Sequence, residues 1–247
     1  MKKFLTGLAC FALVLVGGVS LAACCGNDSI VDTSGNYIDA DIDDVQTALA
    51  GFSAEDVEAY EFRLIFNAEI DGVRMDLNYQ GKLDSHNNAL LDMDFNMSGS
   101  QGGNTLNLTQ NGQLYYDAST NYYYLNSGDL KQKSAGFGPS TDMFSTFKNM
   151  INADYIYSQY FLTPQESDVS YQISTSGGHT KVHLTIVEQM DNGETSTGNI
   201  YFITDSENNF VGFQMIGNIE GGNITLEFIS TTGAVEFPSD LDSYVEA

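Results

Sequence analysis

The chain has 247 residues and a formal net charge of −24, from 9 basic and 33 acidic residues. So acidic a chain repels the nucleic-acid backbone and anionic headgroups within a Debye length, which excludes nucleic-acid binding. It contains 14 tyrosines and 15 phenylalanines but no tryptophan, and this aromatic content favours β-sheet over helix.

The first 23 residues have the pattern of an export signal. Two lysines precede an apolar run at 4–20, which is shorter than the roughly 20 residues of a membrane-spanning helix. The run ends in Leu-Ala-Ala-Cys at 21–24, which resembles the lipobox of bacterial lipoproteins. The resemblance implies cleavage before Cys24 and attachment of a diacylglyceryl group to its sulfur. We therefore predict lipidation at Cys24 and a location on the extracytoplasmic face of the cell membrane.

Removal of this signal leaves 224 residues with 7 basic and 33 acidic side chains, a formal charge of −26. The membrane anchor must then act without help from a polybasic patch. Cys25 is the one remaining cysteine beside the lipid site, so no intramolecular disulfide is expected. The polar stretch 24–42 predicts a flexible tether.

The folded part is predicted to begin with a short helix. Apolar residues recur at helical spacing over 43–51 behind two aspartates, and a second helical piece is possible at 54–58. From Tyr60 the apolar period changes to two, as in a strand with one buried face. Asp71-Gly72 then predicts a tight hairpin turn, because such turns need positive φ.

Alternating runs separated by turn signals continue along most of the chain, which is typical of an antiparallel meander. Asn87-Asn88, Asn111-Gly112, Gly177-Gly178, Asn208-Asn209 and Gly221-Gly222 are predicted turns. The predicted strands lie at about 60–70, 73–84, 91–98, 104–110, 113–118, 121–126, 168–175, 180–190, 198–204, 210–218 and 223–230.

One helical segment interrupts the meander. Met143, Phe144, Phe147 and Ile151 share one face of a helix predicted over about 140–151, a possible lid. The run 155–161 fits a second helix or a strand, and its periodicity does not decide between them.

About ten strands make a sheet near 48 Å wide, at about 4.8 Å per strand, and a few short helices cannot cover it. The sheet must therefore curl into a closed barrel or a half-barrel with helices plugging its mouth. With its lipobox, tether and Met-, Tyr- and Phe-rich strands, the chain resembles LolA/LppX-type bacterial lipoproteins over about 43–240. The resemblance implies one unclosed half-barrel domain at 43–247, with an apolar cavity that holds a lipid.

The inward-facing side chains are the candidate binding site. Methionine adapts to irregular ligands, and each buried methylene contributes about 0.8 kcal/mol. The alternative is that these side chains fill one another and leave no cavity. The predicted ligand-binding residues are Phe62, Leu64, Phe66, Met75, Leu77, Tyr79, Met93, Phe95, Met97 and Phe147.

Other chemistry has weaker support in the sequence. His179 and His183 lie in one predicted strand, where four residues span about 13 Å, too far for a shared zinc ion. Asp39, Asp41 and Asp43 start like a calcium loop but lack its glycine and its glutamate. No nucleophile, base and orienting group form a recognisable set, so we expect no enzyme, no cofactor and no metal.

Two functions remain. We expect a lipid-anchored binding protein that holds a lipid or other hydrophobic ligand in a half-barrel. The alternative is a surface interaction protein with a filled core, which acts through its acidic exterior on a protein partner.

Overall fold

The computed structural model describes residues 29–54, 57–70, 72–101, 104–128, 130–135, 153–160, 168–189, 195–219 and 221–247. These residues form mainly strands. The strands are β1 (Ile38–Ala40), β2 (Ala59–Ile70), β3 (Val73–Asp84), β4 (Ala89–Gln101), β5 (Asn104–Asp117), β6 (Tyr122–Ser127), β7 (Leu130–Ala135), β8 (Asp168–Ser176), β9 (His179–Gln189), β10 (Thr195–Asp205), β11 (Phe210–Ile219), β12 (Gly222–Thr231) and β13 (Val245–Glu246).

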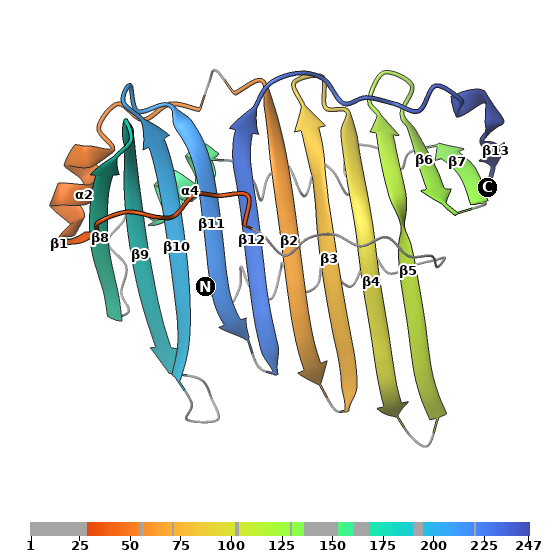
Figure 1. The fold of residues 1–247 in the computed structure, drawn as a ribbon, viewed down its shortest axis with the longest axis horizontal. Coiled ribbons are helices and arrows are strands. Elements are labelled where there is room, and N and C mark those ends of the chain that lie inside the picture. Colours follow the sequence, from red (N-terminus) through yellow and green to blue (C-terminus); the bar gives the residue numbers. More distant parts are fainter. Residues whose placement is uncertain are drawn as a thin grey trace.

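All thirteen strands belong to one curved sheet (Figure 1), in the order β1-β8-β9-β10-β11-β12-β2-β3-β4-β5-β6-β7-β13. Every neighbouring pair is antiparallel except β13 and β7, which are parallel. The edge strands β1 and β13 lie at opposite ends of this order, so the sheet is open. The predicted mainly-β half-barrel is confirmed, and a closed barrel is excluded.

The hairpin turns follow the predicted turn signals. Gly72 has φ +77°, and Gly177 and Gly178 have φ +63° and +80°. Two turns share the pattern Asp-Ser-x-Asn-Asn, at 84–88 between β3 and β4 and at 205–209 between β10 and β11. In each of them the first asparagine has a φ of 63° and the aspartate accepts hydrogen bonds from the backbone amides that follow.

The prediction of a turn at Asn111-Gly112 is wrong, because β5 runs through it without a break. A Cβ on Gly112 would lie 2.7 Å from the carbonyl oxygen of Asn126. The glycine therefore allows β6 to approach β5 closely rather than turning the chain.

Two helices pack at the β8–β10 end of the sheet: α2 (Ile42–Ala48) and α4 (Ala153–Tyr160). The first agrees with the helix predicted at 43–51, and its N-terminus is capped by Asp41 and Asp44 in a reciprocal capping box. The second decides the open assignment of 155–161 in favour of a helix. The whole of the helix predicted at about 140–151, Phe147 included, lies outside the described residues.

Part of the predicted tether is packed on the sheet. Residues 29–37 cross the outer face of the sheet from β12 towards β8, and β1 then adds a strand at that edge (Figure 1). Ser29 donates to the buried Glu227 of β12, and Val31 is 4% exposed. Residues 29–41 therefore belong to the folded domain, which differs from the predicted flexible tether at 24–42.

An ion pair holds this N-terminal segment on the outer face. Nζ of Lys181, whose side chain is 3% exposed, donates to Asp32 Oδ2 at 2.9 Å and to the Ser34 carbonyl at 2.7 Å. The Ser34 hydroxyl also donates to Asp32 at 2.6 Å. The Ser34 hydroxyl and the Lys181 ammonium together hold the pKa of Asp32 well below its usual range.

We expect acid to release residues 29–40 from the outer face. Because the pKa of Asp32 is lower when the segment is docked, the contribution of its ion pair to docking is complete above the ordinary carboxyl pKa of about 4. It is lost progressively as the pH falls from that value through the lowered pKa. Hydrogen exchange of this segment, corrected for intrinsic rates, should therefore accelerate below about pH 4. The variant Asp32→Asn should show the fast exchange already at pH 7. Equal protection of the segment at pH 7 and pH 3 would contradict the assignment.

The C-terminal segment covers the other end of the outer face. After β12 the chain runs along one rim of the sheet, forms the short 3-10 helix η1 (Leu241–Ser243) and ends beside β7 (Figure 1). The ring of Phe237 lies 6.0 Å from that of Tyr115, and the ring of Tyr244 lies 5.5 Å from that of Tyr124. Both ends of the described chain therefore pack against the outer face of the sheet.

Candidate functional site

The concave face of the sheet is the candidate site. Strand register places Leu64 of β2 opposite Tyr79 of β3, and Tyr79 opposite Met93 of β4. Met75 of β3 and Met97 of β4 are direct partners. Because partners and every second residue share a face, nine predicted residues lie side by side on this surface. They are Phe62, Leu64, Phe66, Met75, Leu77, Tyr79, Met93, Phe95 and Met97.

Burial on this face changes along the strands. Near the strand centres the side chains are buried, for example Phe62 and Phe95, both 2% exposed. Towards the hairpin ends at 71 and 102, Met75, Met97 and Leu108 are half-buried. At the same end, the register places Ile70 and Leu106, which are 47% and 38% exposed. The concave face of β2–β5 is thus mainly apolar, with the buried Gln110 of β5 opposite Phe95, and it is open at one end.

The charged residues of β2–β5 all occupy the opposite, outer face. By the alternation that places Phe62 and Tyr79 inward, their side chains point away from the concave surface. These residues are Glu61, Arg63, Glu69, Arg74, Asp76, Lys82, Asp84, Asp92, Asp94 and Asp117. Over these four strands the concave face therefore presents no charge to a ligand.

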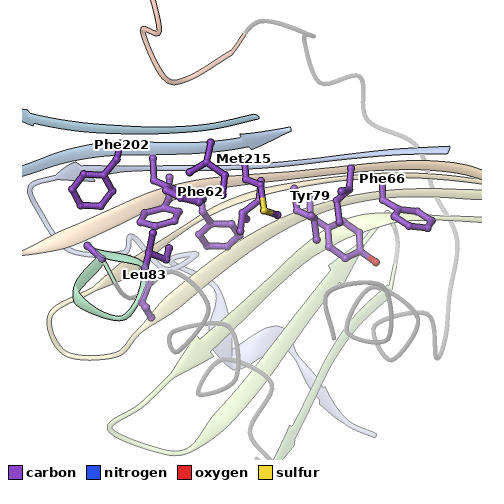
Figure 2. Close-up of a cluster of buried hydrophobic side chains, with 14 of the residues drawn as sticks. Phe62, Phe66, Tyr79, Leu83, Phe202 and Met215 are labelled. Carbon is purple, nitrogen blue, oxygen red and sulfur yellow. The ribbon is translucent and has the colours of Figure 1, made fainter. Parts of the chain in front are cut away.

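The second half of the sheet continues the apolar surface. Phe202 of β10 and Met215 of β11, both labelled in Figure 2, are at most 1% exposed. They belong to the same cluster, as does the fully buried Phe228 of β12. These residues were predicted to lie in strands but not in the binding site. The missing information was that β12 pairs with β2, which sets Leu226 opposite Leu64 although they are far apart in the sequence.

Two predicted site residues lie outside the described residues: the lipidation site Cys24 and Phe147 of the predicted lid. The two histidines lie on the outer face of β9. The ring of His183 stacks on Tyr201 at 4.3 Å, and Nε2 lies 3.0 Å from Asn199 Oδ1. Within the described ranges, no three His, Cys, Asp or Glu side chains are grouped so that they could hold a metal ion.

A hollow of about 230 Å³ lies between the N-terminal segment and the outer face of β9–β12. It is lined by apolar side chains such as Ile203 and Ile229, with Lys181 at its wall. The Lys181 ammonium at this wall is already held by the Asp32 carboxylate and the Ser34 carbonyl. Among the residues that the structure describes, no helix has the length and apolar character needed to cross a bilayer.

No protein-family model matches the sequence, and no curated protein is significantly similar to it. Among solved structures, the chain is similar to LprF from Mycobacterium bovis, with a TM-score of 0.46 and 11% sequence identity. The similarity covers 80% of this chain and 97% of LprF.

Proposed function

We propose that this protein binds a lipid or another hydrophobic ligand on the concave face of its half-barrel, without catalysing a reaction. The proposal includes a lipid anchor at Cys24, a location on the extracytoplasmic side of the cell membrane and a place among LolA/LppX-type lipoproteins. The observation that carries it is the uncharged apolar surface of β2–β5, which opens at the end lined by Met75, Met97 and Leu106.

The physical basis is desolvation. An acyl chain laid against this surface leaves water, and each methylene contributes about 0.8 kcal/mol. The two paired methionines at the open end are unbranched and can adapt to chains of different shape. Apolar side chains at this end are exposed to water, for example Ile70, whose exposed fraction is 47%. A bound ligand would cover them and remove this apolar surface from water.

The first experiment is lipid mass spectrometry on residues 26–247, a range that contains every described residue. We expect a co-purified lipid at about one molecule per protein, and uptake of the uncharged fluorescent probe N-phenyl-1-naphthylamine by the delipidated protein. A protein that is empty and takes up no probe would refute the proposal. It would favour the alternative of a filled core and an acidic exterior that binds a protein partner.

A charge placed at the open end should weaken binding selectively. Met97→Asp puts a carboxylate on the half-buried concave surface, and we expect probe affinity to fall at least about ten-fold, since burial of a methionine is worth about 1.5–3 kcal/mol. Ser98→Asp is the matched control: it adds the same charge one residue later, on the exposed outer face of the same strand. Probe titration of both variants should separate them. Equal affinities would place the ligand elsewhere.

A further inference from the structure

A cleft of about 600 Å³ lies on the rim of the sheet, between the β3–β4 turn and the β5–β6 turn. Figure 1 shows these two turns next to each other on the rim along which the C-terminal segment runs. The volume is within the usual range of small-ligand sites, about 300–1,000 Å³. The polar and aromatic side chains that line the cleft are His86, Asn87, Asn88, Asp117, Ser119 and Phe237. None of them belongs to the predicted binding site on the concave face.

The walls of this rim cleft are held in place by contacts within the protein. Oδ1 of Asn88 accepts from the amide of Ala118 at 3.1 Å, and this bond joins the two turns. Nδ2 of Asn88 donates to Asp84 Oδ2, also at 3.1 Å. The ring of Phe237 packs 6.0 Å from that of Tyr115. Because these groups are already ordered, a ligand would bind with little further loss of conformational entropy.

The charges around the rim cleft favour an uncharged ligand. Among the described residues that line it there is no lysine or arginine, so an anion would have no counter-ion. The one carboxylate is that of Asp117, which already accepts from the amide and hydroxyl of Ser119, at 2.9 and 2.7 Å, and from the hydroxyl of Thr120 at 2.8 Å. A cation would therefore find a single carboxylate that is largely satisfied.

The remaining groups of the rim cleft combine hydrogen bonding with one apolar surface. The exposed imidazole of His86 makes no hydrogen bond with any residue in the described ranges, and its two nitrogens can donate and accept. Asp117 and Ser119 keep lone pairs that can accept further bonds. The half-buried ring of Phe237 provides the apolar surface. An uncharged ligand that matches this lining has an apolar face surrounded by hydroxyl groups, which is the chemistry of a pyranose ring.

The other Asp-Ser-x-Asn-Asn turn, at 205–209, does not repeat this lining. Glu207 occupies the position that corresponds to His86. The cleft beside that turn is smaller, about 300 Å³, and has the acidic side chains of Glu58 and Asp205 among its lining residues. The weakly charged lining with a free imidazole is therefore particular to the rim cleft and is not a general property of this type of turn.

We propose that the rim cleft binds one pyranose unit of an uncharged saccharide. The sugar ring packs its C–H face on Phe237, which removes apolar surface from water, and its hydroxyl groups bond to His86 and Asp117. This site is independent of the concave face, so it would serve in addition to the proposed binding of a hydrophobic ligand.

Saturation-transfer NMR with three uncharged trisaccharides, maltotriose, mannotriose and triacetylchitotriose, tests this site. We expect at least one of them to receive saturation from the protein, mainly at the protons of one ring face, and to shift the amide signals of His86 and Ala118. Absence of saturation transfer to all three sugars would overturn the inference. So would binding that leaves both amide signals unchanged.

Variants of the lining identify the site. Phe237→Leu keeps an apolar side chain against Tyr115 but removes the flat ring, and His86→Ala removes an exposed side chain that is not needed for packing. In each variant the affinity for the sugar that binds the wild type should fall at least about five-fold, as expected for the loss of one favourable contact. Glu207→Ala, at the equivalent position of the other turn, is the matched control and should bind as the wild type does.

The same titrations separate this inference from the proposed function. Met97→Asp, which alters the concave face, should leave the sugar affinity unchanged. Unchanged affinity in both His86→Ala and Phe237→Leu would overturn the inference, as would equal losses in Glu207→Ala or in Met97→Asp. Sugar binding that is lost only in the rim-cleft variants would support it, whether or not the protein takes up N-phenyl-1-naphthylamine.

Discussion

Replacing Phe228 by alanine should lower the free energy of unfolding by about 3–5 kcal/mol, the usual range for a buried phenylalanine. Phe228 is fully buried on β12, the strand that joins the two halves of the sheet. Its ring lies 4.9 Å from that of Phe213, 5.4 Å from Phe210 and 6.0 Å from Tyr60. Truncation would leave a cavity among rings that are held by two different strands, β11 and β2, and that cannot all move into the space.

Urea denaturation followed by circular dichroism would measure this effect. Phe228→Leu is the matched control, because it keeps most of the apolar volume and should lose clearly less stability than the alanine variant. A loss below about 1 kcal/mol for Phe228→Ala would mean that the neighbouring rings collapse into the space, and would contradict a tightly packed junction between β12 and β2.

The second large effect is expected at Asp84. Its carboxylate is 5% exposed and accepts hydrogen bonds from the amides of His86, Asn88 and Val235, and from the Asn88 side chain. Asp84→Ala leaves these donors without their charged partner, and we expect a loss of about 3 kcal/mol in unfolding free energy. The C-terminal segment should also loosen, because the Val235 contact joins it to the β3–β4 turn.

The second Asp-Ser-x-Asn-Asn turn provides the control. Asp205 accepts from the Glu207 amide and from the amide and side chain of Asn209. Among the residues that the structure describes, it has no counterpart of the contact between Asp84 and Val235. Asp205→Ala should therefore cost less stability than Asp84→Ala and leave hydrogen exchange near Val235 unchanged. Faster exchange at Val235 in both variants would contradict a local role for Asp84.

The stability supplied by Asp84 should also depend on pH. Burial disfavours its charged form, but the amides of Val235 and Asn88 outweigh burial and lower its pKa. Because the pKa is lower in the folded state, the contribution is present above the ordinary carboxyl pKa of about 4 and is lost as the pH falls through the lowered value. The stability difference between the wild type and Asp84→Ala should therefore shrink in acid.

Local signals in the sequence were enough to predict most of the strands. The change to a period of two at Tyr60 and the turns at Gly72 and Asn208 fix where strands begin and end, because they depend on neighbouring residues only. The predicted turn at Asn111-Gly112 is wrong because a glycine can allow a close approach of two strands as well as a turn. The two uses differ in tertiary contacts, which a single sequence does not display.

The candidate site was predicted in part for the same reason. Nine inward residues of β2–β4 follow from alternation and hairpins. The contribution of β10–β12 depends on the pairing of β12 with β2, between residues such as Phe228 and Phe62 that are separated by most of the chain. The docking of residues 29–37 likewise depends on Lys181, which lies 149 positions after its partner Asp32. Polar composition alone could not distinguish this docked segment from a free one.

The docking of Ser29 on Glu227 has a consequence for how the protein would sit at a membrane. Ser29 lies five positions after Cys24, and five extended residues span at most about 18 Å. A lipid on Cys24 would therefore be held within about 18 Å of the outer face near β12, instead of being separated from the domain by a long flexible linker. The proposed ligand-binding surface is the opposite, concave face of the sheet, so the anchor would not be attached on the face that is proposed to hold the ligand.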